Sequence, residues 1–422
     1  MEYIPKVIKA HEKRKILENF FSLTTLQSVN SILPVIVLFY LIRVIGPEKF
    51  GLIAFAQALI QYFLIVTDYG FNLTATRRIS VFRDQKRKVW QIFSAVMSVK
   101  LILSAASFLI LLAIVYFIPR FGQDPLVYLL SFGVVIGNTL FPVWYLQGTE
   151  KMKYIAVINI ICGILYTASI LLLVKSPANY LDVPALTSLF SIISGLLGFY
   201  ITIRKFKVKF ITQPFEKIKE EFTEGWDVFV SIVAINAYTA TRTFAVGLLT
   251  NNIITGYYSI AERIANFVQT FPLYSLSQAV YPKISKIFAD SEERALKLMR
   301  KIQNTTIAVY SLVLPVVFLL TPWIVWIFCG REFKEVILAT RILLVSVFFI
   351  VSNTFRVQFL LVIERPDIYS KIHVAAAIIG LPLIFILIYF FSYVGAACST
   401  IILEAGIFAA TYYIVKNLKI FS

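Results

Sequence analysis

The feature that most restricts the fold of this chain is a series of long apolar segments separated by short polar ones. Segments of roughly 18 to 25 apolar residues are long enough to cross a bilayer as helices. Hydrophobic residues make up 59% of the 422 residues and charged residues only 15%, too few to cover a soluble protein of this size. The sequence therefore predicts an all-α membrane protein with twelve transmembrane helices, near residues 17–42, 50–70, 91–118, 125–147, 154–174, 183–203, 222–249, 253–280, 303–329, 337–362, 369–391 and 394–415.

The spacing of residues in this series repeats half a chain later. Four residues of the second segment and the loop after it have counterparts 205 positions later, and three residues in and after the fourth segment have counterparts 215 positions later. The first set pairs Gly51, Ala56, Gln57 and Ser80 with Gly256, Ala261, Glu262 and Ser285, and the second pairs Asn138, Thr139 and Tyr154 with Asn353, Thr354 and Tyr369. With six segments in each half, the repeat predicts two parallel, pseudo-symmetric six-helix lobes related by an axis along the membrane normal.

The two lobes predict a division of the chain into five parts. These are an N-terminal interfacial segment (1–15), a first lobe with helices 1 to 6 (16–203), a linker (204–221), a second lobe with helices 7 to 12 (222–415) and a C-terminal tail (416–422). In the fourth segment, Gly133 and Gly137 form a small-xxx-small pattern, which favours close helix packing inside the protein over a dimer interface.

Lysine and arginine indicate how the helices are oriented. They concentrate before the first segment and after the second, sixth and eighth, whereas the loops after the first, third and fifth hold no more than two each. Because cytoplasmic loops retain these residues, both termini and the linker are predicted to be cytoplasmic, and no cleaved signal peptide is expected. The net charge of +17 is spread over separate loops, which favours anionic lipid headgroups over nucleic acid as the partner.

The sequence offers little material for an enzyme. There are two histidines, His11 and His373, and no Gly-rich loop with Lys and Ser/Thr for nucleotide hydrolysis. The three cysteines, Cys162, Cys329 and Cys398, have no paired spacing, so we predict no disulfide, no metal site and no cofactor. The loops predicted to face outward are too short for the folded domain of a membrane glycosyltransferase.

Polar residues inside the apolar segments are the main functional signal, because they are costly in a bilayer. Glu262, Asn266 and Gln269 lie four and three residues apart and share one helix face. At the matching positions the second segment carries Gln57 and Gln61, with Asp68 two turns further on, and the first and seventh segments add Asn30 and Asn236. Turned inward, these stripes would line one central hydrophilic cavity.

Five cations in or at the ends of apolar segments are candidate ligands for an anion: Arg242, Lys100, Arg263, Arg341 and Arg356. Each would cost about 3 kcal/mol on an isolated helix, so each should be paired, hydrated or at an interface. Arg242 and Glu262 are predicted at similar depth on neighbouring antiparallel helices, where they form either part of the cavity or a purely structural ion pair. Arg341 and Arg356 either line the cavity or reach the interfaces. Lys100 and Glu404 lie near the middle of their helices without a partner on the same helix.

Three motifs resemble signatures of the O-antigen flippases, the polysaccharide transporter branch of the multidrug/oligosaccharidyl-lipid/polysaccharide exporter superfamily. They are DYGFNLTATRRIS at 68–80, FPVWYLQGTEKMKY at 141–154 and SLSQAVYPKIS at 275–285. The resemblance covers essentially the whole chain and implies a two-lobed bundle, like that of the multidrug extruders, around a cationic cavity.

The resemblance also implies an activity. Such proteins move an undecaprenyl-pyrophosphate-linked oligosaccharide from the cytoplasmic to the periplasmic leaflet of the bacterial inner membrane by rocking of the lobes, driven by a gradient of H⁺ or Na⁺. A polysaccharide polymerase and a chain-length regulator would be partners. The candidate coupling or gating carboxylates are Glu262, Glu404, Asp68 and Asp227. The alternatives are a multidrug or small-metabolite antiporter of the same superfamily and, from another class, a membrane polymerase or glycosyltransferase.

Overall fold

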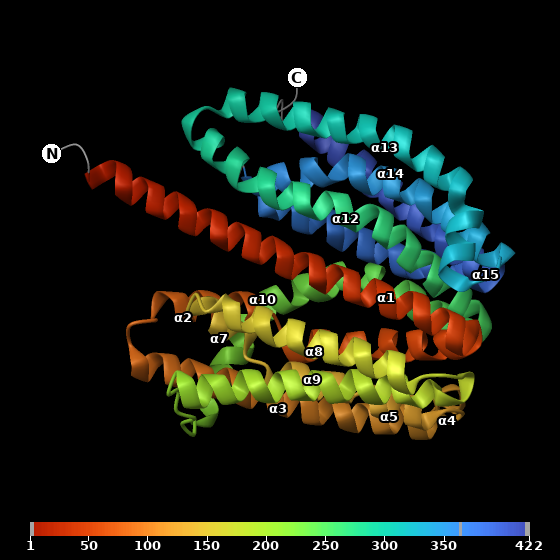
Figure 1. Cartoon of the computed structure of the whole chain (residues 1–422), viewed down its shortest axis with the longest axis horizontal. Coiled ribbons are helices and arrows are strands. Elements are labelled where there is room, and N and C mark those ends of the chain that lie inside the picture. Colours follow the sequence, from red (N-terminus) through yellow and green to blue (C-terminus); the bar gives the residue numbers. More distant parts are fainter. Residues whose placement is uncertain (1–3, 363–364, 418–422) are drawn as a thin grey trace. The chain divides into compact units, whose positions relative to one another are not determined.

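The computed structural model describes residues 4–362 and 365–417, and within these ranges the chain is almost entirely helical, with no strand (Figure 1). The first half of the chain contains α1 (Ile4–Asp68), α2 (Phe71–Val81), α3 (Lys86–Phe117), α4 (Pro119–Gly122), α5 (Pro125–Ser131), α6 (Gly133–Leu140), α7 (Val143–Gly148), α8 (Met152–Leu173), the 3₁₀-helix η1 (Pro177–Leu181), α9 (Asp182–Tyr200) and the π-helix η2 (Ile201–Lys205). The second half contains α10 (Phe215–Thr239), α11 (Thr241–Leu249), α12 (Asn252–Asp290), α13 (Glu292–Cys329), α14 (Lys334–Val362) and α15 (Pro366–Asn417).

Every predicted apolar segment lies on this series of helices. Two helices carry two segments each: α1 bends at Gly46, whose φ of 73° suits glycine, and α15 departs from helical geometry at Ser392. In the described part of the chain, eight helices are long and apolar enough to cross a membrane, or nine if α10 and α11, bent by 51°, form one span. An all-α, multi-pass membrane protein is therefore confirmed, whereas the number twelve stays a prediction.

The described residues group into two compact units. Within the described ranges 4–362 and 365–417, unit 1 comprises residues up to 44 and 66–225, and unit 2 comprises 45–65 and the residues from 226 onward. The helices α1 and α10 therefore each contribute residues to both units. The predicted lobes, 16–203 and 222–415, remain a prediction.

Unit 1 is held together by close helix packing at small residues. The backbone of α6 lies directly against α9, where a Cβ added at Gly137 would overlap Ser191 and one added at Gly195 would overlap the Gly137 carbonyl. Gly133 lies in the same way against Ser188. The predicted use of Gly133 and Gly137 for packing within the protein is thus confirmed.

Unit 2 is built around α14, which packs against α12, α13 and α15 (Figure 1). The 45–65 segment of α1 belongs to this unit and meets α12 where both helices have glycine. A Cβ on Gly51 would overlap the backbone of Gly256, and a Cβ on Gly256 would overlap the carbonyl of Pro47. The glycines that match in the sequence repeat therefore face each other backbone to backbone.

Candidate functional site

Arg242 lies at a break between two helices of unit 2. α10 ends at Thr239 and α11 begins at Thr241, with a bend of 51° between them. Broken helices at membrane depth are tolerated where protein or a water-filled cavity satisfies the released backbone groups, and they often line transport sites. The break sets Arg242, in the first turn of α11, beside α12.

The guanidinium of Arg242 is enclosed but only partly satisfied. Its Nε lies 3.8 Å from Oε1 of Glu262, within ion-pair range but too far for a hydrogen bond, and its side chain is 11% exposed. Among the described residues, its buried Nε and Nη1 have no hydrogen-bond partner. A buried arginine with unused donors is the group expected to bind a carboxylate or phosphate.

Glu262 is held in place by groups other than Arg242. The hydroxyl of Thr243 on α11 donates to Oε2 at 2.7 Å, and the hydroxyl of Tyr258, one turn earlier on α12, donates to Oε1 at 3.4 Å. The carboxyl group of Glu404 on α15 also interacts electrostatically with Arg242. Two carboxylates on two different helices therefore act on one arginine.

Arg263, the next residue along α12, bonds to the segment that matches it in the repeat. Its Nη2 donates to Oε1 of Gln57 at 2.8 Å, and its guanidinium lies 5.2 Å from the centre of the Phe50 ring. Gln57, a polar position of the repeat, is thus bonded to the residue that follows its repeat counterpart Glu262. Gln61 and Asn266 are exposed.

The remaining predicted residues of unit 2 lie in separate environments. Arg341 donates to the carbonyl of Phe318 at 3.3 Å, and Arg356 is placed over the rings of Phe408 and Tyr412 at 4.7 and 5.1 Å. No recorded contact among the described residues joins either arginine to Arg242. Asn236 donates to its own helix at the carbonyl of Ile232, Gln269 is half-buried, Asp227 is exposed, and the side chain of Asn30 lies outside the described part.

Lys100 forms a second charged cluster, in unit 1. Its Nζ donates to Oδ1 of Asp68 at 2.9 Å and to Oδ1 of Asn138 at 3.4 Å, and the lysine side chain is 2% exposed. Asp68 ends α1 just before a tight turn in which Tyr69 and Gly70 both have positive φ, 44° and 81°. The predicted cation and the predicted gating carboxylate are therefore partners, a pairing that the sequence did not indicate.

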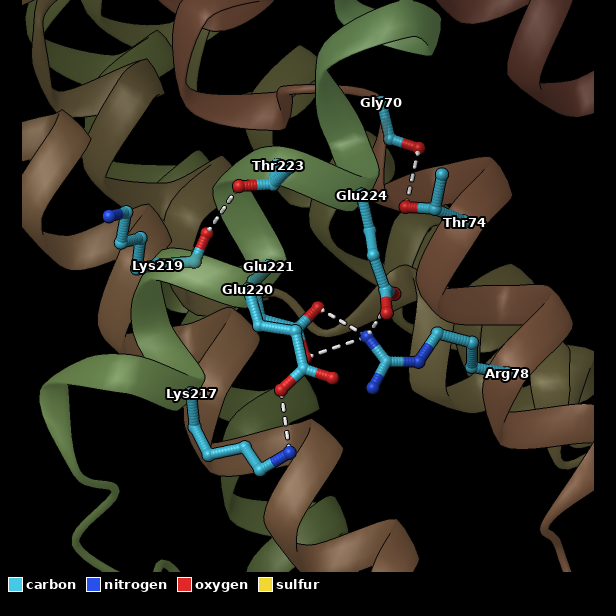
Figure 2. A network of polar contacts seen from close by, with 9 residues as sticks. All are labelled: Gly70, Thr74, Arg78, Lys217, Lys219, Glu220, Glu221, Thr223 and Glu224. Atoms are coloured by element: carbon cyan, nitrogen blue, oxygen red, sulfur yellow. Dashed lines mark hydrogen bonds and ion pairs between the residues drawn. The ribbon is translucent and has the colours of Figure 1, made fainter.

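A third cluster, which the sequence interpretation missed, joins α2 to the first turns of α10 (Figure 2). Nη1 of Arg78 lies 2.7 Å from both carboxylate oxygens of the buried Glu221 and 2.9 Å from Oε2 of Glu224. The hydroxyl of Tyr69 donates to the carbonyl of Phe222 at 3.2 Å, and the Tyr69 ring lies against Gly225. The signal available in the sequence was the cluster of three glutamates within residues 220–224, at the end of the basic linker.

Two of the three sequence motifs also meet one another. α2, from the 68–80 motif, packs against α7, from the 141–154 motif. Gly148 lies directly against Ile79, and the hydroxyl of Thr76 donates to the carbonyl of Trp144 at 3.3 Å. Most side chains of the 275–285 motif lie outside the described part of the structure.

The fold is found in solved transporters. The lipid II flippase MurJ in an inward closed conformation superimposes with a TM-score of 0.72 at 16% identity, over 93% of this chain and 87% of that one. An inward-facing multidrug resistance MATE family transporter of the MOP superfamily gives 0.66 at 14% identity, over 94% and 96%. At these identities the likeness shows the fold alone.

Sequence comparison identifies the family. A protein of Escherichia coli (strain K12) named as an O-antigen transporter is 27% identical over 410 residues, which is 97% of this chain and 98% of that protein. The family model described as polysaccharide biosynthesis protein matches residues 16–288, more than half of the chain. This protein therefore belongs to the polysaccharide biosynthesis protein family.

Proposed function

We propose that the protein is a flippase that moves an undecaprenyl-pyrophosphate-linked oligosaccharide, an O-antigen unit or a similar glycan precursor, from the cytoplasmic to the periplasmic leaflet of the bacterial inner membrane. Its family and its relative named as an O-antigen transporter support a glycan cargo. The fold shared with a lipid II flippase supports a cargo attached to a lipid. With transporters and flippases among its relatives, the protein is a transporter rather than an enzyme.

The observation that carries the proposal is the enclosed guanidinium of Arg242 with two unsatisfied donors. Pyrophosphate offers several acceptor oxygens to such a group, and the pairing is charge-assisted. Glu262 at 3.8 Å keeps the arginine oriented without occupying its donors. The headgroup would bind here while the polyprenyl chain stays in lipid.

Coupling to an H⁺ or Na⁺ gradient belongs to the same proposal. Glu262 and Glu404 are the carboxylates that interact with Arg242, so binding of a cation to either would change the charge that the guanidinium faces. Asp68, paired with Lys100, and the exposed Asp227 are less suited to this role.

We also propose a number and arrangement for the membrane spans. It comprises twelve spans in two parallel six-helix lobes, 16–203 and 222–415, joined by the 204–221 linker, with the segments 1–15 and 416–422 on the cytoplasmic side. Two alternating conformations of these lobes would expose the site to one leaflet at a time. A polymerase and a chain-length regulator would act on the delivered units.

The test is the sidedness of the lipid-linked glycan in cells from which the gene has been deleted. Spheroplasts are treated with a membrane-impermeant reagent that modifies only sugars on the outer face. Accumulation of protected, cytoplasmic-facing lipid-linked units supports the flippase. Accumulation of single units exposed outside favours a polymerase. Normal surface glycan together with sensitivity to toxic compounds favours a multidrug antiporter.

A further inference from the structure

Unit 1 contains a cavity of about 560 Å³ whose lining includes neither Arg242 nor Lys100. Three stretches line it: the turn before α3 with the first turns of α3, α7 with the turn that follows it, and the end of η2 with the segment that follows. The sequence predicts the loops of all three stretches on the cytoplasmic side. Its size falls within the range of small-molecule and headgroup sites.

The lining of this cavity is strongly basic. Six cations surround it, and Asp84 is the carboxylate among the lining residues: the cations are Arg83, Lys86, Lys151, Lys205, Lys207 and Lys209. Arg83 has an ion-pair partner, Glu150, with Nη1 to Oε1 at 3.0 Å. For the five lysines no salt bridge is recorded within the described part of the chain. The cavity therefore holds a surplus of positive charge.

Aromatic and apolar side chains line the cavity together with the cations. The Nζ of Lys151 lies 3.5 Å from the centre of the Phe206 ring, and that of Lys209 lies 5.3 Å from the Trp90 ring. Tyr145, which is buried, also lines the cavity. Partial burial lowers the pKa of the Lys151 ammonium, since desolvation disfavours its charged form. An anion bound beside Lys151 would offset that penalty.

The two turns that carry these lysines are held in uncommon backbone geometry. Glu150, next to Lys151, has φ 58°, and Lys207 has φ 53°. Residues other than glycine rarely adopt positive φ, and such positions gather at binding and switch sites. Lys207 lines this cavity and Glu150 stands between two residues that line it, Thr149 and Lys151, on stretches more than fifty residues apart in sequence.

We propose that this cavity binds the phosphate or pyrophosphate headgroup of a lipid in the cytoplasmic leaflet. Each of the three lining stretches contributes one cation to the headgroup: Lys86, Lys151 and Lys207. Lysine suits a phosphate as a compact point charge, and the aromatic rings suit the boundary between headgroup and acyl chain. The proposal does not depend on flippase activity. If that activity is established, the cavity is an entry site where the headgroup of the cargo docks.

The test is headgroup binding by the full-length protein, purified in an uncharged detergent. Isothermal titration calorimetry is run with farnesyl pyrophosphate, dioctanoyl phosphatidylglycerol, inorganic pyrophosphate and dioctanoyl phosphatidylcholine. The pocket variant combines Lys86→Gln, Lys151→Gln and Lys207→Gln. The matched control combines Arg294→Gln, Lys297→Gln and Lys301→Gln, three exposed cations of α13, so both variants lose the same charge.

We expect the pocket variant to bind the anionic lipids about tenfold more weakly than the wild type, and the control less than twofold more weakly. Preference for farnesyl pyrophosphate assigns the cavity to pyrophosphate-linked lipids, and equal binding of phosphatidylglycerol assigns it to anionic phospholipids. Equally tight binding of inorganic pyrophosphate shows that the source is free phosphate and overturns the lipid part of the proposal.

Equal losses in the pocket and control variants, or none in either, would overturn the proposal as a whole. A variant with Lys86→Arg, Lys151→Arg and Lys207→Arg keeps the charge and should retain binding, which separates lost charge from lost fold. A variant with Lys151→Gln alone removes a single charge and so disturbs the fold less than the triple variant. The proposed flippase activity is tested separately, by glycan sidedness, so either proposal can be overturned while the other stands.

Discussion

Gly51 and Gly256, which stand at matching positions of the sequence repeat, face each other with no room for a side chain on either. This contact fixes how closely the 45–65 segment of α1 approaches α12. Through it, Gln57 comes within 2.8 Å of Arg263. The matching glycines therefore bring a polar pair together across a contact that leaves no room for a side chain.

Changing Gly256→Ala should destabilise the protein, because the new Cβ would overlap the carbonyl of Pro47. Relieving this overlap would cost about 1 to 3 kcal/mol. The control is Gly406→Ala on α15, where nothing lies within 4 Å of the added Cβ. There we expect a gain of roughly 0.5 to 1 kcal/mol from helix propensity. Thermal unfolding in detergent should show midpoint shifts of opposite sign, and shifts of the same sign would contradict the contact.

Changing Arg78→Ala should loosen the start of α10. It leaves the buried carboxylate of Glu221 without its cation, at a cost of about 2 kcal/mol. The control is Arg77→Ala, an exposed neighbour of the same residue type. Hydrogen exchange of residues 215–225 should rise for Arg78→Ala alone. Equal exchange in both variants would mean that the cluster in Figure 2 does not hold this segment.

Changing Arg242→Ala should abolish transport while the protein remains inserted in the membrane, because the unsatisfied donors facing the site are lost. Arg242→Lys keeps the charge without the fork of donors and should retain part of the activity. The control is Arg331→Ala, an exposed arginine of the same unit. The readout is surface glycan in a deletion strain carrying each variant. Normal glycan with Arg242→Ala would exclude the proposed role of this residue.

Lys100 and Asp68 should behave as a coupled pair in a double-mutant cycle. Lys100→Met and Asp68→Asn each leave one charge without its partner, whereas the double variant removes both. We expect a coupling free energy of about 2 kcal/mol, measured from thermal stability in detergent. Additive effects of the two substitutions would show that the 2.9 Å contact contributes nothing to stability.

The positions of the helices could be predicted because each depends on the apolar residues of its own segment. The segments predicted at 91–118 and 154–174 correspond to α3 (Lys86–Phe117) and α8 (Met152–Leu173) within a few residues. Their interruptions were predictable only in part. Pro142 marks the break between α6 and α7 in the segment predicted at 125–147, whereas the segment predicted at 222–249 breaks at Ala240, where neither proline nor glycine marks the position.

The candidate site was predictable to the extent that it follows the repeat and helix periodicity. The similar depth expected for Arg242 and Glu262 agrees with their 3.8 Å approach, since both lie a few turns from one short loop. Partners from distant segments were not predictable. Glu221 lies 143 residues from Arg78, and Asp68 lies 32 residues from Lys100, with the positive-φ turn at Tyr69 and Gly70 between them.

The Lys100–Asp68 pair also has a consequence for how the chain enters the membrane during synthesis. Lys100 lies mid-way along α3, where a lysine opposes insertion by about 2.5 to 3.5 kcal/mol. Asp68 has already been translated when α3 emerges from the ribosome. The earlier helix would neutralise the later one within the translocation channel, so α3 would be released into the lipid together with the end of α1.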